Sequence, residues 1–121
     1  MGLFTKKPAV LFPWVPLTSS EQLRVLIEQS TEVPVLLFKH STSCSISALA
    51  KNRFEQRWTA EPSECICAYL DLLSYRALSN EIETITGVRH QSPQAILIKD
   101  KRVVYEDSHN GISATTILTL L

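Results

Sequence analysis

No stretch of this sequence is apolar for long enough to cross a membrane, because its apolar runs last only a few residues and a spanning helix needs about 20. Neither sign of charge is in excess, since twelve basic residues balance twelve acidic ones. A chain that binds nucleic acid electrostatically carries a basic surplus, which is lacking here. The sequence therefore predicts a protein whose partners are neither membranes nor nucleic acids.

Cysteine is also scarce, because the chain has three residues of this type, Cys44, Cys65 and Cys67. A disulfide scaffold requires a larger and even number of cysteines, so this fold is not expected to depend on disulfides. The 121 residues, 45% of them hydrophobic, are enough for one domain with a core of its own. Near the N-terminus, prolines interrupt an apolar stretch that is too short for a secretory signal. We therefore expect a cytoplasmic protein, whose thiols are kept reduced.

The hydrophobic pattern alternates between helical and extended segments. In chain order, we expect a helix near 19–29, a strand at 35–38, a helix at 45–59, a strand at 65–70, a helix ending at Gly87, strands at 94–98 and 103–105, and a helix at 112–121. This alternation indicates an α/β domain, and its order is also that of the thioredoxin fold. We expect a single thioredoxin-like domain over 17–121, with a central mixed four-stranded sheet flanked by helices. Residues 1–16 are expected to form an arm or an extra N-terminal edge strand.

Particular side chains carry more detailed predictions about these elements. Trp14 is expected to anchor the N-terminal arm on the domain. Ser79 or Asn80 is the expected cap of the third helix, by residue type. The first helix is expected to begin at a capping box formed by Thr18 with Glu21 or by Ser19 with Gln22. The apolar face of the second helix is expected to consist of Ile46, Leu49, Ala50, Phe54 and Trp58.

Cys44 has the position of a reactive thiol, between the apolar run at 35–38 and a helix that begins near Ser45. The first turn of a helix exposes unpaired N–H groups and a partial positive charge, and both stabilise an anion. Cysteines in such positions have pKa values lowered from about 8.5 toward about 3.5–7.5. We therefore predict a nucleophilic thiolate, with Lys39 and His40 adding positive charge nearby. The alternative is a cysteine that only packs at the loop.

Ser47 occupies the fourth position, where the dithiol redox motif Cys-x-x-Cys has its second cysteine. A thiolate in such a site can attack a mixed disulfide and take the small thiol onto itself, but a second thiol from outside the motif must then release it. Ser47 is also expected to donate a hydrogen bond to the Cys44 thiolate.

The remaining cysteines and histidines have simpler interpretations. Cys65 and Cys67 are two apart on a predicted strand, so they share a face, and we expect both to be buried structural thiols. The alternative, a resolving role for either thiol, requires it to lie near Cys44. The histidines, at positions 40, 90 and 109, match no standard zinc spacing with Cys44. We therefore expect no metal and no other bound cofactor.

Four separated motifs give the sequence a specific resemblance. They are Lys39-His40-Ser41-Thr42-x-Cys44-x-Ile46-Ser47, Arg76-x-Leu78-Ser79-Asn80, Gly87-Val88-x-His90-x-Ser92-Pro93-Gln94 and Ser108-His109. From about Leu17 to the C-terminus, the sequence resembles the YtxJ-like monothiol bacilliredoxins, a family with a thioredoxin-like fold. The family motif is Thr-Cys-Pro-Ile-Ser, so Ser43 and Ser45 replace the usual threonine and proline. Loss of that proline removes a fixed φ and restores one N–H at the helix start.

The resemblance implies a function in which Cys44 attacks S-thiolated proteins and removes bacillithiol, the co-substrate, from them. It implies that Thr42 and Ser45 tune the thiolate or position the substrate, as do Ser92 and Pro93. Fold analogy places a cis proline opposite the active cysteine, and we expect the Ser92–Pro93 bond to be cis. Two other hypotheses are a non-catalytic thioredoxin-like binding or adaptor module with a passively modified cysteine, and a metal- or cluster-binding monothiol protein.

Overall fold

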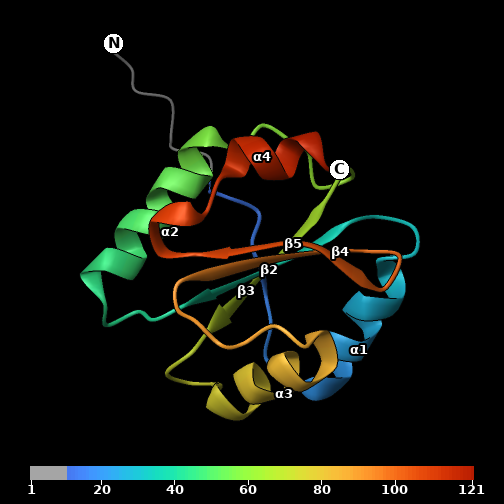
Figure 1. Cartoon of the computed structure of the whole chain (residues 1–121), viewed down its shortest axis with the longest axis horizontal. Coiled ribbons are helices and arrows are strands. Elements are labelled where there is room, and N and C mark those ends of the chain that lie inside the picture. Colours follow the sequence, from blue (N-terminus) through green and yellow to red (C-terminus); the bar gives the residue numbers. More distant parts are fainter. Residues whose placement is uncertain (1–10) are drawn as a thin grey trace.

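A five-stranded mixed sheet forms the centre of the computed structural model, which describes residues 11–121 (Figure 1). Its strands are β1 (Val15–Pro16), β2 (Val35–His40), β3 (Ile66–Asp71), β4 (Gln94–Lys99) and β5 (Arg102–Ser108), in the order β1-β3-β2-β4-β5. Strands β1, β3 and β2 are parallel, whereas β4 and β5 are antiparallel to their neighbours. The predicted mixed sheet with an N-terminal edge strand is confirmed, although residues 1–10 of the expected arm lie outside the described residues.

Helices cover both faces of this sheet. They are α1 (Ser20–Gln29), α2 (Ser45–Arg57), α3 (Arg76–Thr86) and α4 (Ala114–Thr119), with a 3₁₀ turn, η1 (His109–Gly111), before α4. In Figure 1, α2 and α4 lie above the sheet and α1 and α3 lie below it. Successive side chains of a strand point to opposite faces, so β2 contributes to two cores. Val35 and Leu37 pack with α1 and α3, whereas Leu36 and Phe38 pack with α2 and α4.

Trp14 holds the segment before β1 against the domain, as predicted. Its ring lies 5.4 Å from that of Phe38 and 5.7 Å from that of Phe54, measured between centroids. The indole N–H donates a hydrogen bond to the carboxylate of Glu55 on α2. Aromatic pairs of this kind add about 0.5–1.5 kcal/mol each beyond the burial of their surface.

Two helix ends are as expected and one is different. Ser19 caps α1, because its hydroxyl accepts a hydrogen bond from the Gln22 N–H at 3.1 Å. Gly87 ends α3 with a φ of 73°, in the left-handed region that glycine adopts without steric cost. The predicted cap of α3 is wrong, because the helix already begins at Arg76 and Ser79 lies buried within it.

The predicted apolar face of α2 is also partly wrong. Ile46 and Leu49 are each 62% exposed, whereas Ser47, Ala50 and Phe54 are buried. The buried three are spaced by three and four residues and so form one line along the helix. A polar residue, Ser47, therefore lies on the face that contacts the sheet, and the apolar pattern alone gives the wrong rotation of this helix.

Shortening one buried and one exposed side chain of α2 tests this orientation. Phe54→Ala is expected to lower the free energy of unfolding by about 3–5 kcal/mol, because the ring is 2% exposed and contacts several other aromatic rings. Leu49→Ala, the matched control, is expected to change it by less than about 0.5 kcal/mol. Urea unfolding followed by fluorescence measures both. Similar losses for the two variants would mean that α2 packs in a different rotation.

Candidate active site at the end of strand β2

Cys44 lies where the chain turns from β2 into α2. It is the residue that precedes the first turn of α2, and it is partly exposed. Its N–H donates to the Ser41 carbonyl at 3.1 Å, which closes the loop. Within residues 11–121, no side-chain capping hydrogen bond joins the Cys44 thiol to the first turn of α2. Cys44 is thus the N-cap residue of α2. The first turn of a helix has unpaired backbone N–H groups, which favour an anion near them.

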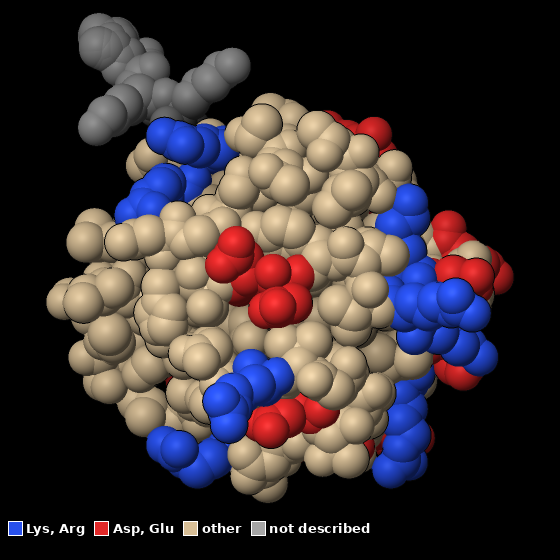
Figure 2. Space-filling model, in the orientation of Figure 1, with Lys and Arg blue, Asp and Glu red and all other residues tan. Residues whose placement is uncertain are grey.

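The surface around the start of α2 is mainly uncharged in the view of Figure 2. The loops after β2 and β3 and the loop before β4 meet at the edge of the molecule where α2 begins, on the left in Figure 1. In the same view, Figure 2 shows mainly uncharged side chains where α2 begins, whereas lysine and arginine gather near the turn between β4 and β5. The exposed Ile46 and Leu49 belong to this first part of α2. The first turns of α2, residues 45–50, therefore carry no charged side chain.

Lys39 and His40 lie inside β2 instead of in the loop that the sequence predicts after residue 38. Lys39 is 0% exposed and His40 is 5% exposed. Both residues pair with β3, and Lys39 also pairs with β4. Because they are adjacent in a strand, their side chains point to opposite faces of the sheet. The two residues thus have different surroundings.

His40 fixes the loop that carries Cys44. Its Nδ1 is 2.7 Å from the Ser47 hydroxyl, which also accepts a hydrogen bond from the Ser41 N–H at 3.2 Å. One hydroxyl thereby joins the end of β2, the first residue of the loop and the first turn of α2. Ser47 was expected to donate to the Cys44 thiolate, but the partners that the structure gives it within 11–121 are His40 and Ser41.

His40 does not supply the positive charge that the sequence predicts. Burial lowers the pKa of His40, and the nearby charge of Lys51 lowers it further, while Asp71 acts in the opposite direction. An imidazole whose pKa is lowered from 6.5 is neutral at neutral pH. Its contribution is therefore to hold Ser47 and the loop in place.

Lys39 points to the other face of the sheet, toward α3. Its ammonium lies 3.3 Å from His90 Nδ1 and 3.5 Å from the Ser79 carbonyl. Burial lowers the pKa of Lys39 to about 8, and the charge of Glu83 acts against this shift. At neutral pH the side chain remains mostly protonated. Its positive charge thus interacts with Ser79 of α3 and His90 of the loop before β4, in a buried cluster.

Ser92 and Pro93 lie at the same edge of the sheet as the Cys44 loop. The expected cis bond between them is confirmed. The Pro93 carbonyl accepts a hydrogen bond from the His109 N–H at 3.0 Å, which fixes the start of β4 against the end of β5. The Ser92 hydroxyl oxygen is buried, and no described residue gives it a hydrogen-bond partner. Thr42 and Ser45 are exposed, on the loop and on the first turn of α2.

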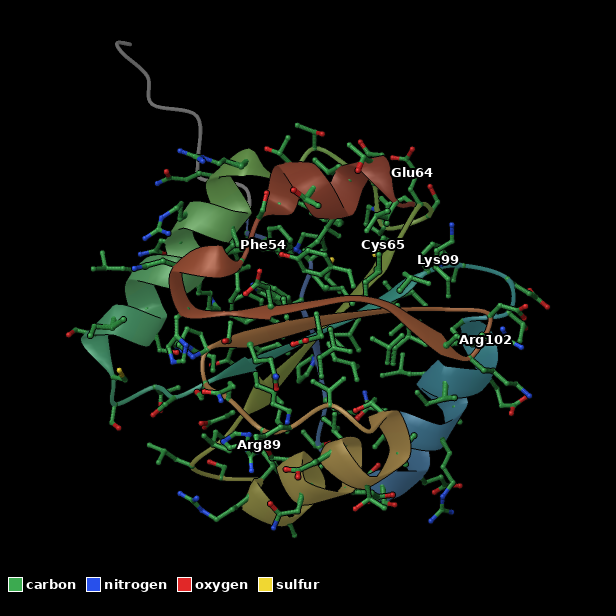
Figure 3. All side chains as sticks on the ribbon, viewed as in Figure 1. Phe54, Glu64, Cys65, Arg89, Lys99 and Arg102 are labelled. Carbon is green, nitrogen blue, oxygen red and sulfur yellow. The ribbon has the colours of Figure 1, made fainter. Side chains whose placement is uncertain are left out.

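Cys65 and Cys67 are buried, as predicted. They are 2% and 3% exposed and lie in the core between the sheet and the layer of α2 and α4. A hydrogen bond with Cys65, together with burial, raises the pKa of the Cys67 thiol, which therefore stays protonated. Cys67 pairs with Leu36, which precedes the end of β2 by roughly 13 Å of strand. Figure 3 shows Cys65 at the other end of the sheet from the start of α2.

The described residues include no group of three or more histidine, cysteine or acidic side chains placed to hold a metal ion. In the same part of the chain, 11–121, no helix has the length and apolar character required to cross a bilayer.

Sequence reasoning names Ser79, His90 and Gln94 in the motifs of the resemblance but does not group them around Lys39. Each has a buried or half-buried polar side chain that contacts the Lys39 cluster or the loop before β4. The sequence feature that indicates such partners is Lys39 itself, which follows directly after an apolar run. A lysine in a central strand requires partners, because an unpaired buried charge is very costly.

The fold and the site together define a class of protein. A mixed sheet with helices on both faces, and a cysteine at the start of the helix after a central parallel strand, is the arrangement of thioredoxin-fold thiol oxidoreductases. A solved structure described as a proposed oxidoreductase with a thioredoxin fold is similar to this chain at 29% identity and a TM-score of 0.75, over 88% of this chain and 92% of that one.

Thioredoxins resemble the chain more distantly. A thioredoxin of Nicotiana alata matches at 12% identity and a TM-score of 0.68, over 95% of both chains. Mitochondrial thioredoxin 3 of Saccharomyces cerevisiae matches at 16% identity and a TM-score of 0.65, over 88% of this chain and 91% of that one. These two likenesses support the fold alone. The family is shown by the model described as monothiol bacilliredoxin BrxC, which matches residues 15–117. The chain belongs to the monothiol bacilliredoxin family.

Removal of the Ser47 hydroxyl tests its structural role. Ser47→Ala leaves the Ser41 N–H and His40 Nδ1 without their partner, so we expect the free energy of unfolding to fall by about 1–3 kcal/mol. Ser45→Ala, two residues earlier on the same helical turn, removes an exposed hydroxyl and is expected to change it by less than about 0.5 kcal/mol. Urea unfolding of the reduced protein measures both. Equal stability of Ser47→Ala and wild type would contradict this role.

Proposed function

We propose that the protein is a monothiol thiol–disulfide oxidoreductase that removes bacillithiol, a low-molecular-weight thiol, from S-thiolated proteins. The observation that carries the proposal is the contrast among three free thiols. Cys44 is partly exposed at a helix start, whereas Cys65 and Cys67 are buried, Cys65 at the other end of the sheet and Cys67 beside Leu36 near the start of β2. The family supports bacillithiol as the small thiol. The cytoplasm, where protein thiols are kept reduced, is the proposed location.

In the proposed first step, the Cys44 thiolate attacks the sulfur that belongs to the small thiol. The disulfide between target and small thiol breaks, and the target leaves as a thiolate that takes a proton from water. A new disulfide then joins Cys44 to the small thiol. The electrons balance, because one disulfide is exchanged for another.

The proposed second step requires a thiol from outside the domain. Ser47 occupies the resolving position and has no sulfur, and Cys67 pairs with Leu36, roughly 13 Å of strand before the end of β2. A free small thiol or a thiol of another protein attacks the mixed disulfide on Cys44. Cys44 leaves as a thiolate, and a new disulfide forms between the attacking thiol and the small thiol.

Transfer of the small thiol tests the first step. A bacillithiolated target protein is incubated with the reduced wild-type chain, and both proteins are followed by intact mass. We expect one adduct per wild-type chain, and a rate at least about 100-fold lower for Cys44→Ser, because a serine hydroxyl does not exchange with disulfides. Cys65→Ala, which alters a buried thiol, is the control that keeps transfer. Undiminished transfer to Cys44→Ser would falsify the proposal.

Restoring the missing thiol tests the second step. Ser47→Cys places a second thiol three residues after Cys44, as in dithiol motifs. We expect this variant to release the small thiol by itself and to form a disulfide within the motif, whereas the wild-type adduct persists until an external thiol is added. Intact mass and release of free small thiol distinguish the two. Spontaneous release from the wild type at the rate of Ser47→Cys would show that a resolving thiol already exists in the chain.

A further inference from the structure

Two fully buried polar side chains hold the loop that precedes β4. Lys39 of β2 and Gln94 of β4 are opposite each other in the sheet, and both are 0% exposed. Gln94 Nε2 donates to the Arg89 carbonyl at 2.9 Å, and its Oε1 accepts from the Gln91 N–H at 3.4 Å. Lys39 Nζ lies 3.3 Å from Nδ1 of His90, between these two residues. Three consecutive loop residues are thereby tied to two neighbouring strand ends, and Figure 3 shows Arg89 on this loop beside α3.

His90 is the point at which β2, α3 and the loop meet. A lysine ammonium can only donate, so Nδ1 of His90 is the acceptor. The Ser79 hydroxyl is 3.1 Å from the same nitrogen, and the backbone N–H of His90 donates to Glu83 Oε1 at 3.1 Å. Burial lowers the pKa of His90, and the charges of Lys39 and Arg76 lower it further. The charge of Glu83 acts in the opposite direction. The imidazole is therefore neutral and keeps its acceptor at neutral pH.

A buried ammonium is not needed to fill space at this position. Apolar residues of similar volume often replace buried ions with little or no loss of stability. What the ammonium adds is a directed contact with His90, two residues before Ser92 and three before Pro93. The same strand continues from Lys39 through His40 into the Cys44 loop. Lys39 thus connects the loop that carries Cys44 with the loop that precedes β4. We call the edge of the sheet where these two loops meet the active edge.

We propose that Lys39 is a positioning residue for the exchange reaction. Through its contact with His90, Lys39 holds Ser92 and Pro93 in the position relative to Cys44 at which a target polypeptide is bound for attack. The inference deepens the proposed function and rests on it. Because its side chain lies on the face opposite α2, Lys39 acts through the loop and not on the sulfur. It therefore affects disulfides carried by polypeptides and leaves small disulfides unaffected.

Two disulfide substrates separate these effects. One is a cysteine peptide that carries 5-thio-2-nitrobenzoate, and the other is 5,5′-dithiobis(2-nitrobenzoate), which has no polypeptide. With either probe, Cys44 attacks the disulfide and forms a new disulfide with the remaining half, and 5-thio-2-nitrobenzoate, the thiol of lower pKa, leaves as the coloured thiolate that is measured. For Lys39→Met, we expect the rate constant with the peptide to fall about tenfold, as for loss of a hydrogen bond to a charged group, with the small disulfide unchanged. Lys99→Met, the control, removes an ammonium that binds the Leu120 carbonyl and is expected to change neither rate. An equal fall in both rates, or no fall, overturns the proposal.

Two substitutions at His90 give a second test that does not require a change inside β2. His90→Leu removes the acceptor for Lys39, whereas His90→Asn places an amide oxygen near the position of Nδ1. We expect His90→Leu to lose peptide reactivity as Lys39→Met does, and His90→Asn to keep most of it. Equal losses for the two substitutions would contradict positioning through the Nδ1 acceptor.

Amide hydrogen exchange tests the hold on the loop without any reaction. We expect residues 89–92 to exchange about tenfold faster in Lys39→Met than in wild type, and at an unchanged rate in Lys99→Met. If the wild type transfers no bacillithiol but the exchange and the peptide rates change as expected, only the proposed function fails. Unchanged exchange in Lys39→Met overturns the positioning role even if bacillithiol transfer succeeds.

Discussion

The burial of two polar residues at the end of β2 is the constraint on which the active edge depends. An ammonium and an imidazole in a central strand are tolerated only when each has partners, because removing them from water is costly. Strand alternation sends Lys39 toward α3 and His40 toward α2. His40 therefore binds the loop and helix that carry Cys44, and Lys39 binds the loop that leads to Pro93. The end of β2 thus holds both the loop that carries Cys44 and the loop that leads to Pro93.

In the proposed function, the chemistry depends on the single sulfur of Cys44. The Ser47 hydroxyl, which stands where a dithiol motif has its second thiol, is engaged with His40 and the Ser41 N–H. The other two cysteines belong to the core between the sheet and the α2–α4 layer, and the Cys67 thiol is held protonated. The proposed nucleophile at a helix start, with serine at the resolving position of the motif, suits a protein that accepts a small thiol and passes it on to another.

The sequence predicts the features that depend on local patterns. The order of helices and strands, the buried thiols at 65 and 67 and the left-handed Gly87 follow from periodicity and residue type. It fails where partners come from distant segments. Lys39 is placed in a loop by its charge, yet it is buried because its partners lie 40 and 51 residues further along the chain. The rotation of α2 is missed likewise, because Ser47 turns inward to reach His40 while Ile46 and Leu49 remain exposed.

The central claim is that Cys44 carries the small thiol alone, and the location of that thiol after one turnover tests it most directly. The protein is reacted with a bacillithiolated target, quenched with acid and digested without reduction, and its peptides are analysed by mass spectrometry. The account predicts bacillithiol on the peptide that contains Cys44, with Cys65 and Cys67 both found as free thiols. A disulfide that joins Cys44 to either of those two cysteines would contradict it, because the chain would then contain its own resolving thiol.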